Sequence, residues 1–417
     1  MGAEGPPGLF GGRTQPWQRM SSRSLRIAIV KPEWRIRGGF ELVVDRIVNR
    51  LVDGGHDVRI LAYDAWKCDH RPFGRRVPDQ SWSRAPEFFT FLSQLESCRQ
   101  LEIDAADLVI STQPPTYAVE HPRHLSLFFH HARMFNDLSE YMIEAGLVDA
   151  EVHPAACTAV QAIEDRALNQ VTHIAAGSET VAKRLADLNG RDAGVSLFHA
   201  GPSVEALPTD LPSQGEHVLC VSRHDFPKRT ELFVLAAHLA PEVHCVSVGT
   251  GSRLGLLRVL DERLARDGTA AETDPLRLWC NSDPLLDLAA TPHEDGLVRF
   301  DGSVSDEVLE QRYRDAICVV APALLEDYGL TAIEAMRYGK PLIVCTDGGH
   351  LCHLVEDGVT GLVVEPTGSA IAAAIRYLAS NPDVASEMGR RGQEVAATFT
   401  WERAMREFEA AIEATLS

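Results

Sequence analysis

Short apolar runs alternate along this chain with segments in which apolar residues recur at helical spacing. Residues 25–30 form an apolar run and predict a buried strand, and residues 56–62 predict a second one. Between them, the apolar positions of residues 40–52 fall on one face of a helix: Val43, Val44, Ile47 and Leu51. A strand, a helix and a second strand in this order form a βαβ unit, which implies a parallel sheet.

The same alternation continues to residue 200 and restarts after residue 216. The further strands predicted for the first half are residues 107–111, 125–129, 173–177 and 195–198, with a helix at 179–188. For the second half the pattern predicts strands at 218–221, 243–248, 297–300 and 317–321, and helices at 232–239, 253–267 and 306–314. Two such halves predict two Rossmann-like α/β domains that face a central cleft, where ligands usually bind.

The composition of the connecting segments sets the domain boundaries. Proline and glycine are frequent between the halves, which is typical of a linker. The first residues lack apolar periodicity, and we expect a disordered extension there. We therefore divide the chain into an extension (1–24), an N-terminal domain (25–200), a linker (201–216), a C-terminal domain (217–395) and a C-terminal amphipathic helix (396–417).

Charge and cysteine usage exclude several classes of protein. The formal net charge is 40 − 59 = −19, which argues against a dedicated nucleic-acid binder. The nine cysteines form no CxxC pair, and Cys220 and Cys245 fall inside predicted strands as small core residues. No apolar run reaches the roughly 18–20 residues of a membrane-spanning helix. These features predict a cytoplasmic protein with reduced thiols.

Two glutamates lie on either side of a predicted helix start near Gly329. Glu326 lies in the loop before the helix, and Glu334 lies on its second turn. Helix N-termini bind anions, and carboxylates accept hydrogen bonds from vicinal hydroxyls. The arrangement would suit a ligand with phosphates in the middle and a hydroxylated group at each end. A capping role for Glu326 and a solvent-facing role for Glu334 are the structural alternatives.

Polar groups also follow predicted strands in the first half. Gly38 and Gly39 precede the first helix, where glycine lets a phosphate approach the backbone; a plain turn is the alternative. His130 and His131 follow the strand at 125–129 directly, at the sheet edge where parallel sheets bind ligands.

The segment that begins at Glu326 resembles the retaining glycosyltransferases of family 4, which have the GT-B fold. Their motif has two glutamates with this spacing, an aromatic residue and glycine after the first, and Ala-Met after the second. The matching residues are Glu326, Tyr328, Gly329, Glu334, Ala335 and Met336, followed by similar segments at 339–344, 347–349 and 357–364. The resemblance implies transfer of a sugar with its configuration retained, and a C-terminal helix that crosses back to the N-terminal domain.

The resemblance also implies residue roles. Arg223 and Lys228 would neutralise the donor diphosphate, Glu326 and His130 would contact the sugar, and Glu334 would hold the ribose. The expected catalytic residues are thus His130, Arg223, Lys228 and Glu326. The expected donor-binding residues are Gly38, Gly39, Ser303, Val304, Asp327, Tyr328, Gly329, Leu330, Thr331 and Glu334. Further candidates are His131, Arg133, Gly249 and Gly251.

Two features depart from the family pattern. There are two histidines where the family often has one, and the alignment favours His130 with a register open by one residue. The loop at residues 64–87 has no family counterpart, although it carries Trp66, Phe73, Trp82 and several basic residues. It could recognise an acceptor, contact an anionic acceptor or a membrane surface, or be an ordinary solvated loop.

We therefore expect a glycosyltransferase that uses a UDP-hexose or UDP-N-acetylhexosamine as donor substrate and needs no cofactor. The chain has no Asp-x-Asp triplet, so we expect no metal ligands. The acceptor stays open among a small molecule, a glycan and a glycolipid, as do weak membrane contact and a homodimer. The alternatives are a nucleotide-sugar epimerase of the same fold and a non-catalytic sugar-nucleotide-binding protein. A phosphorylase would need a pyridoxal-type lysine site that we do not identify.

Overall fold

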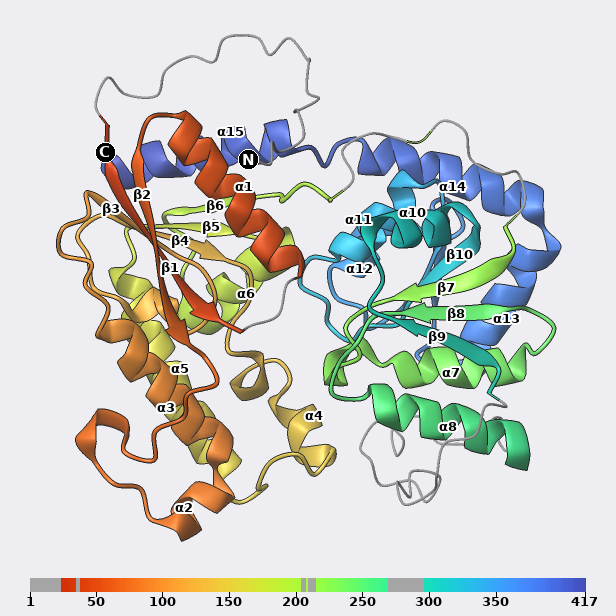
Figure 1. The fold of residues 1–417 in the computed structure, drawn as a ribbon, viewed down its shortest axis with the longest axis horizontal. Coiled ribbons are helices and arrows are strands. Elements are labelled where there is room, and N and C mark those ends of the chain that lie inside the picture. Colours follow the sequence, from red (N-terminus) through yellow and green to blue (C-terminus); the bar gives the residue numbers. More distant parts are fainter. Residues whose placement is uncertain (1–23, 35–37, 204–207, 209–214, 269–295) are drawn as a thin grey trace, which may run out of the picture.

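The computed structural model describes residues 24–34, 38–203, 208, 215–268 and 296–417. Within them the chain forms two six-stranded sheets, ordered β2-β1-β3-β4-β5-β6 and β12-β11-β10-β7-β8-β9, and every strand pair is parallel. The sheets form two lobes side by side, with helices on both faces of each (Figure 1). This architecture confirms the predicted α/β class with two Rossmann-like halves. The predicted N-terminal extension and most of the linker lie outside the described residues.

The first lobe contains every strand and helix predicted for it. Its strands are β1 (Arg26–Glu33), β2 (Asp57–Asp64), β3 (Leu108–Ser111), β4 (His124–Phe128), β5 (His173–Ala176) and β6 (Val195–Leu197). Its helices are α1 (Gly39–Asp53), α2 (Asp79–Arg84), α3 (Pro86–Arg99), α4 (Ser139–Glu144), α5 (His153–Gln170) and α6 (Glu179–Asn189). Single 3₁₀ turns lie at Pro72–Gly74, Thr116–Ala118 and Arg133–Phe135.

The side chains of β1 show how this sheet is buried on both faces. Ile27 and Ile29 pack with the apolar face of α1, whereas Ala28 and Val30 pack with residues of α3 and α5. Successive side chains of a strand point to opposite faces, so a continuous apolar run is the sequence of a strand covered on both sides.

The second lobe repeats this layering. Its strands are β7 (His217–Val221), β8 (Cys245–Val248), β9 (Val298–Gly302), β10 (Ala316–Ala321), β11 (Leu342–Cys345) and β12 (Gly361–Val364). Its helices are α7 (Thr230–Leu239), α8 (Leu254–Asp267), α10 (Asp306–Arg314), α11 (Leu330–Arg337), α12 (Leu351–Leu354), α13 (Gly368–Ser380) and α14 (Pro382–Ala396), with a 3₁₀ turn at Phe226–Lys228. Cys220 and Cys245 are unpaired and buried in its core, which confirms their predicted structural role.

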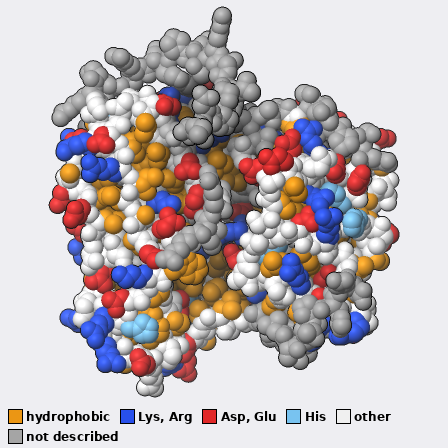
Figure 2. All heavy atoms as spheres, viewed as in Figure 1, with side chains coloured by type: hydrophobic (Ala, Val, Ile, Leu, Met, Phe, Trp, Pro, Cys, Tyr) orange, Lys and Arg blue, Asp and Glu red, His pale blue; other side chains and the backbone are white. Residues whose placement is uncertain are grey.

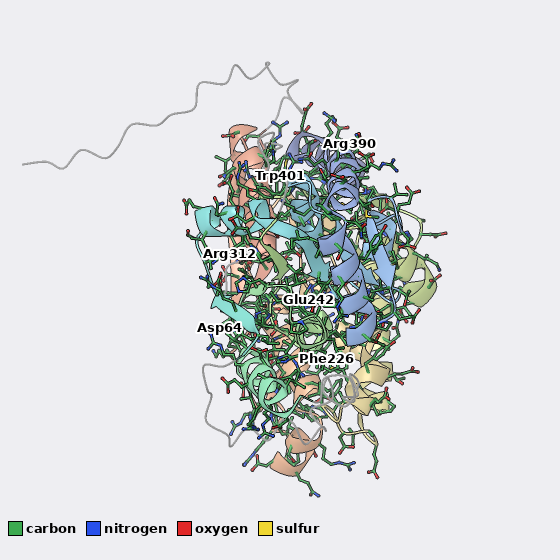
Figure 3. The ribbon with its side chains drawn as sticks, turned by 90° about the vertical axis from the view of Figure 1, so that its right-hand side faces the viewer. Asp64, Phe226, Glu242, Arg312, Arg390 and Trp401 are labelled. Atoms are coloured by element: carbon green, nitrogen blue, oxygen red, sulfur yellow. The ribbon has the colours of Figure 1, made fainter. Side chains whose placement is uncertain are left out.

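The last helix, α15 (Trp401–Leu416), leaves the second lobe and packs on the first sheet (Figure 1). Phe408 and Ile412 are buried in the same core as Ile27 and Ile29. Trp401, labelled in Figure 3, begins the helix, and its indole Nε1 donates to the carbonyl of Pro202 (2.9 Å). The expected crossing helix is therefore present and joins the lobes a second time.

Candidate functional site

The loop between β10 and α11 carries Glu326, and backbone contacts fix its position. The N–H groups of Leu325 and Glu326 donate to the carbonyls of Asp347 (2.9 Å) and Gly348 (3.1 Å). A Cβ on Gly349, whose φ is +63°, would lie 2.7 Å from the Glu326 carbonyl oxygen, so this close approach requires glycine. The segment at 347–349 therefore supports the backbone that presents Glu326.

Glu326 forms an ion pair with Lys228, which ends the turn after β7. Burial would raise the pKa of Glu326, but the charges of Lys228, Arg133 and Arg223 outweigh it and hold that pKa below its usual value. Glu326 is therefore an anion at neutral pH with an ammonium group fixed beside it, and it does not cap α11.

The two arginines near Lys228 have different environments. Arg223 is 67 % exposed along its side chain, and its nearest carboxylate is that of Asp225, at 3.7 Å. Its guanidinium is thus loosely held and available to an anionic ligand. Arg229 is buried, donates to both carboxylate oxygens of Asp347 (2.5 and 2.8 Å) and contacts the Pro322 carbonyl (2.9 Å). Arg229 therefore ties the glutamate loop to the segment that supports it.

Glu334 is buried on the second turn of α11. The Ser203 hydroxyl donates to its Oε1 (2.5 Å), and the Tyr313 hydroxyl lies 3.3 Å from its Oε2. Burial raises the pKa of Glu334, and the hydrogen bonds from Ser203 and Tyr313 offset this only in part. Glu334 is therefore surrounded by hydroxyl donors rather than by cations.

The N-termini of α1 and α11 meet between the lobes. A Cβ on Gly39 would lie 2.6 Å from Cδ1 of Leu330, the first residue of α11. Gly329 precedes α11 with φ +90°, a conformation that favours glycine. The first N–H groups of a helix lack intrahelical partners and carry partial positive charge. Two such ends facing each other, with Gly38 and Gly39 on one side, make a site suited to an anion.

The two adjacent histidines differ in exposure and contacts. His131 is buried, lies edge-on to the Phe128 ring (4.8 Å between centroids), and its Nε2 is hydrogen-bonded to Asn189 (2.9 Å). His130 is half-buried, and its Nδ1 is hydrogen-bonded to the His131 carbonyl (2.8 Å). Burial lowers the pKa of His130, so the ring is neutral at pH 7, and the charge of Asp327 opposes this effect. The structure thus turns His131 into the first lobe and leaves His130 beside the second.

Asp327 and Arg133 belong to an ion-pair cluster that joins the lobes. Arg184 Nη1 donates to Asp327 Oδ1 (2.7 Å), and Arg133 Nε lies 3.5 Å from Asp327 Oδ2. Asp137 completes the cluster because it accepts from Arg133 (2.7 Å) and lies 3.5 Å from Arg184. Arg133 also donates to the Leu325 carbonyl (2.8 Å). The Asp327 carboxylate is therefore engaged by the opposite lobe, next to the loop that carries Glu326.

Two further hydrogen bonds connect the lobes at Asp327 and Tyr328. The Ser178 hydroxyl donates to the Asp327 carbonyl (2.6 Å), and the Tyr328 hydroxyl donates to the Ala200 carbonyl (2.5 Å). A hollow remains between the two lobes on the face shown in Figure 2. The lobes thus touch at the glutamate loop.

Gly249 and Gly251 serve the packing of the turn after β8. A Cβ on Gly249 would lie 1.9 Å from the Ser222 carbonyl oxygen, and one on Gly251 would lie 2.4 Å from that of His224. Both glycines therefore let this turn lie against the loop that carries Arg223, and a direct contact with a ligand stays a prediction.

The remaining expected donor-binding residues lie in the second lobe. Ser303 and Val304 follow β9; Ser303 is exposed, whereas Val304 packs on the core beneath α11. Thr331 lies in the first turn of α11, and its carbonyl lies 3.3 Å from the Tyr313 hydroxyl. These residues lie at the carboxyl-end edge of the second sheet, on the same side as Glu326.

Sequence reasoning missed four residues of this region: Ser178, Arg184, Ser203 and Arg229. None of them belongs to a motif, and each acts through a partner far away in the sequence. The one available signal was position, because Ser178 and Arg184 follow the carboxyl end of β5, where parallel sheets bind ligands.

Neither a cluster of metal ligands nor a membrane-spanning helix is found in the parts of the chain that the structure describes. No group of three or more His, Cys, Asp or Glu side chains among these residues is arranged to hold a metal ion. None of the described helices is long and apolar enough to span a membrane.

Comparison with protein families finds a match in the second lobe. Residues 208–395 match the family model described as Glycosyl transferases group 1, so this part of the chain is similar to that group. D-inositol 3-phosphate glycosyltransferase of Mycolicibacterium vanbaalenii is 28 % identical over 251 residues, which are 57 % of this chain and 52 % of that protein. The enzyme of the same description from Geodermatophilus obscurus is 39 % identical over 116 residues, 28 % of this chain and 25 % of that protein. The chain thus spans about half or less of the length of these relatives.

Solved structures match nearly the whole chain. Sucrose-phosphate synthase of Thermosynechococcus elongatus superimposes with a TM-score of 0.62 at 19 % identity, covering 93 % of this chain and 97 % of that one. Anabaena HepE in complex with UDP and glucose gives a TM-score of 0.59 at 15 % identity, covering 93 % and 99 %. These similarities show that the chain has the GT-B fold, as the resemblance implied.

Proposed function

We propose that this protein is a retaining glycosyltransferase that moves a sugar from a nucleoside-diphosphate sugar to an acceptor hydroxyl. The observation that carries the proposal is the meeting of the α1 and α11 N-termini beside the Lys228–Glu326 pair. The similarity of residues 208–395 to group 1 supports the same class of donor. We further propose UDP as the nucleotide and a hexose or N-acetylhexosamine as the sugar, with HepE and its bound UDP and glucose as the structural parallel.

Each part of such a donor has a matching group in the site. The diphosphate would lie at the two helix N-termini, with Arg223 and Lys228 to balance its charge. Glu334, already surrounded by hydroxyl donors, would accept from the ribose hydroxyls. Glu326, in the loop that precedes α11, would face the sugar, with His130 of the first lobe on the other side of it.

The reaction breaks the bond between the anomeric carbon and the β-phosphate oxygen and forms a bond to the acceptor oxygen on the same face of the sugar. The diphosphate gains negative charge as it leaves, and fixed cations and helix N-termini stabilise that charge in the transition state. The acceptor proton passes to the leaving diphosphate. Because Lys228 engages the Glu326 carboxylate, we assign Glu326 to positioning of the donor and not to covalent attack.

We propose that the cations of the chain do the work that a divalent metal does in other glycosyltransferases. Arg223 and Lys228 supply two positive charges at the site of the diphosphate. Donor turnover should then be unchanged after treatment with EDTA, and a requirement for added Mg²⁺ or Mn²⁺ would contradict this part of the proposal.

Turnover of candidate donors tests the proposal. The protein is incubated with UDP-glucose, UDP-galactose, UDP-N-acetylglucosamine or GDP-mannose, with and without a mixture of acceptors, and release of nucleoside diphosphate is measured. Lys228→Ala and Glu326→Gln should each lower turnover by about 10²-fold, the usual cost of removing one charge-stabilising group. Lys183→Ala, which removes an exposed lysine of the first lobe, is the matched control and should retain activity. Release by neither wild type nor variants, or equal release by all of them, would contradict the proposal.

A further inference from the structure

The loop that follows β2 has a packed part and an exposed part. Trp82 stacks on His70 (3.8 Å between ring centroids) and on Phe89 (5.6 Å), so it anchors the loop to α3. Arg84 is paired with Asp149 (2.7 Å). Both residues therefore have a structural role, although acceptor recognition was one of the functions left open for this loop by the sequence.

Trp66 is different, because it is exposed and yet held in one orientation. The residue is 59 % exposed. Its indole Nε1 donates to the Trp34 carbonyl (2.8 Å), and its ring meets that of Trp34 at 87° with 5.8 Å between centroids. The adjacent carboxylate of Asp64 accepts from the Trp66 backbone N–H (3.1 Å). A large aromatic face is thus presented to solvent in a fixed position.

This aromatic pair lies at the ligand-binding edge of the first sheet. Trp34 follows β1, Trp66 follows β2, and Gln113 follows β3, and these three strands are neighbours in the sheet. Gln113 Oε1 accepts from the Trp34 indole (2.8 Å) and joins the third strand end to the pair. Trp34 is also only four residues before Gly38, where α1 begins at the proposed diphosphate site.

Hydrogen-bonding groups lie at the same strand ends as the aromatic pair. Glu33, the last residue of β1, is 45 % exposed along its side chain and lies 3.3 Å from Lys31. Asp64, the last residue of β2, and Gln113 are half-buried at the neighbouring strand ends. An aromatic face beside carboxylate and amide oxygens is complementary to a ring with C–H groups on one side and hydroxyls at its edge.

We infer that Trp66 and Trp34 form an acceptor subsite that stacks on a pyranose ring, so that the acceptor is a carbohydrate. The inference rests on the proposed function, since it places the acceptor in the first lobe opposite the donor. The sugar C–H face would lie on the Trp66 indole, and Glu33, Asp64 and Gln113 would accept from its hydroxyls. The stacked ring would then lie next to the hollow between the lobes into which the donor sugar is presented.

A membrane surface is the competing occupant. Phe73, at the tip of the loop, is 48 % exposed and lies among the exposed side chains of Arg71, Arg75 and Arg76. An anionic membrane would therefore engage that tip. Trp66 lies instead at the strand ends that carry the acceptor oxygens of Asp64 and Gln113. Acceptor oxygens near an aromatic ring favour a polyhydroxylated ligand.

Binding without donor separates this inference from the proposed function. Wild type, Trp66→Ala, Trp66→Phe and the control Phe73→Ala are titrated with methyl α-glucopyranoside, methyl α-galactopyranoside, methyl α-mannopyranoside and the corresponding α-1,4-linked disaccharides. Tryptophan fluorescence and saturation-transfer NMR report binding, with and without UDP. The same variants are titrated with myo-inositol 3-phosphate and with phosphatidylglycerol vesicles.

We expect at least one glycoside to bind, with saturation transfer strongest at the C–H protons of one ring face. Trp66→Ala should weaken that binding about tenfold, Trp66→Phe should restore part of it, and Phe73→Ala should leave it unchanged. UDP binding should be the same in all four proteins, because neither Trp66 nor Phe73 is among the residues that we assign to the donor.

Three results would overturn the inference: no glycoside binds wild type, binding is equal in Trp66→Ala, or Trp66→Ala loses only vesicle or inositol phosphate binding. If wild type does not bind UDP, this result contradicts the proposed function instead, because donor binding and acceptor binding are measured separately.

Discussion

Glu326 and Glu334 are the same residue type eight positions apart, and their surroundings give them different chemistry. Lys228 holds the pKa of Glu326 down and keeps it charged, whereas burial raises the pKa of Glu334 beside two hydroxyl donors. One carboxylate is therefore balanced by a cation, and the other is prepared for hydrogen bonds from hydroxyl groups. This difference is what a donor with a sugar at one end and a ribose at the other requires.

The two histidines after β4 should respond differently to substitution. His130→Ala should lower turnover while leaving the melting temperature nearly unchanged, because its ring is half-buried and lies beside Asp327. His131→Ala should lower the free energy of unfolding by about 1–3 kcal/mol, because a buried side chain and its bond to Asn189 are lost. Thermal unfolding and turnover of both variants check this. If His130→Ala keeps full activity and His131→Ala is folded but inactive, the histidine of the site is His131 and not His130.

Glu334→Gln should stabilise the protein in a pH-dependent manner. The raised pKa means that the folded state binds more protons than the unfolded state between pH 4.5 and the folded pKa. The free energy of unfolding of wild type therefore falls as pH rises through that window. That of Glu334→Gln does not show this fall, because its amide stays neutral. Melting temperatures of wild type and Glu334→Gln between pH 4 and 8 should diverge toward high pH. A constant difference across that range would contradict the burial of a charged Glu334.

At the scale of elements, helix starts rather than whole helices make the site. α1 and α11 come from different lobes and touch at Gly39 and Leu330. The contact leaves no room for a larger side chain at residue 39 unless Leu330 moves. The close approach of Gly39 and Leu330 thus controls how closely the two helix ends can hold one anion.

Gly39→Ala should weaken donor binding, and Leu330→Ala in the same protein should restore part of it. The added Cβ would lie 2.6 Å from Leu330 Cδ1, and a smaller side chain at residue 330 removes the clash. Gly255→Ala in α8 is the matched control, because its Cβ would meet nothing within 4 Å. UDP titration of wild type, the two single variants, the double variant and the control by calorimetry checks this. Additive effects of the two substitutions would contradict direct contact between the helix starts.

Local patterns predicted elements well and contacts between lobes poorly. The run at 25–30 and the spacing of Val43, Val44 and Ile47 depend on neighbouring residues, so their strand and helix could be predicted. The Glu326 motif could be recognised for the same reason. The bond from Arg184 to Asp327 spans 143 residues, and no local spacing encodes it. Asp327 was expected to bind the donor, and whether it does so directly stays a prediction, because the structure pairs it with the opposite lobe.

At the scale of the whole molecule, the two lobes are joined by the crossing helix and by the Asp327 cluster. α15 is buried against the first sheet, which makes it a permanent connection. The side chains of this cluster are only 11–17 % exposed, and of its ion pairs only those that Arg133 and Arg184 make with Asp327 cross between the lobes and would break when the lobes separate. The cluster is thus suited to favour the closed arrangement without locking it.

Asp327→Asn should open the molecule. Loss of the carboxylate removes the pairing with Arg184 and Arg133, so small-angle scattering without ligand should give a larger radius of gyration than wild type. The donor KM should rise roughly tenfold, because part of the binding free energy is then spent on closure. Asp187→Asn, which removes an exposed pair with Lys183 within α6, is the matched control. If both the radius of gyration and the donor KM stay unchanged, the Asp327 cluster does not favour the closed arrangement.

A crystal structure of the protein with bound UDP would locate the donor directly. We expect the diphosphate at the N-termini of α1 and α11, within reach of Gly39 and Lys228, and the ribose hydroxyls on Glu334. A nucleotide bound to the first lobe alone, or away from Glu334 and Lys228 in the second, would contradict this placement of the donor.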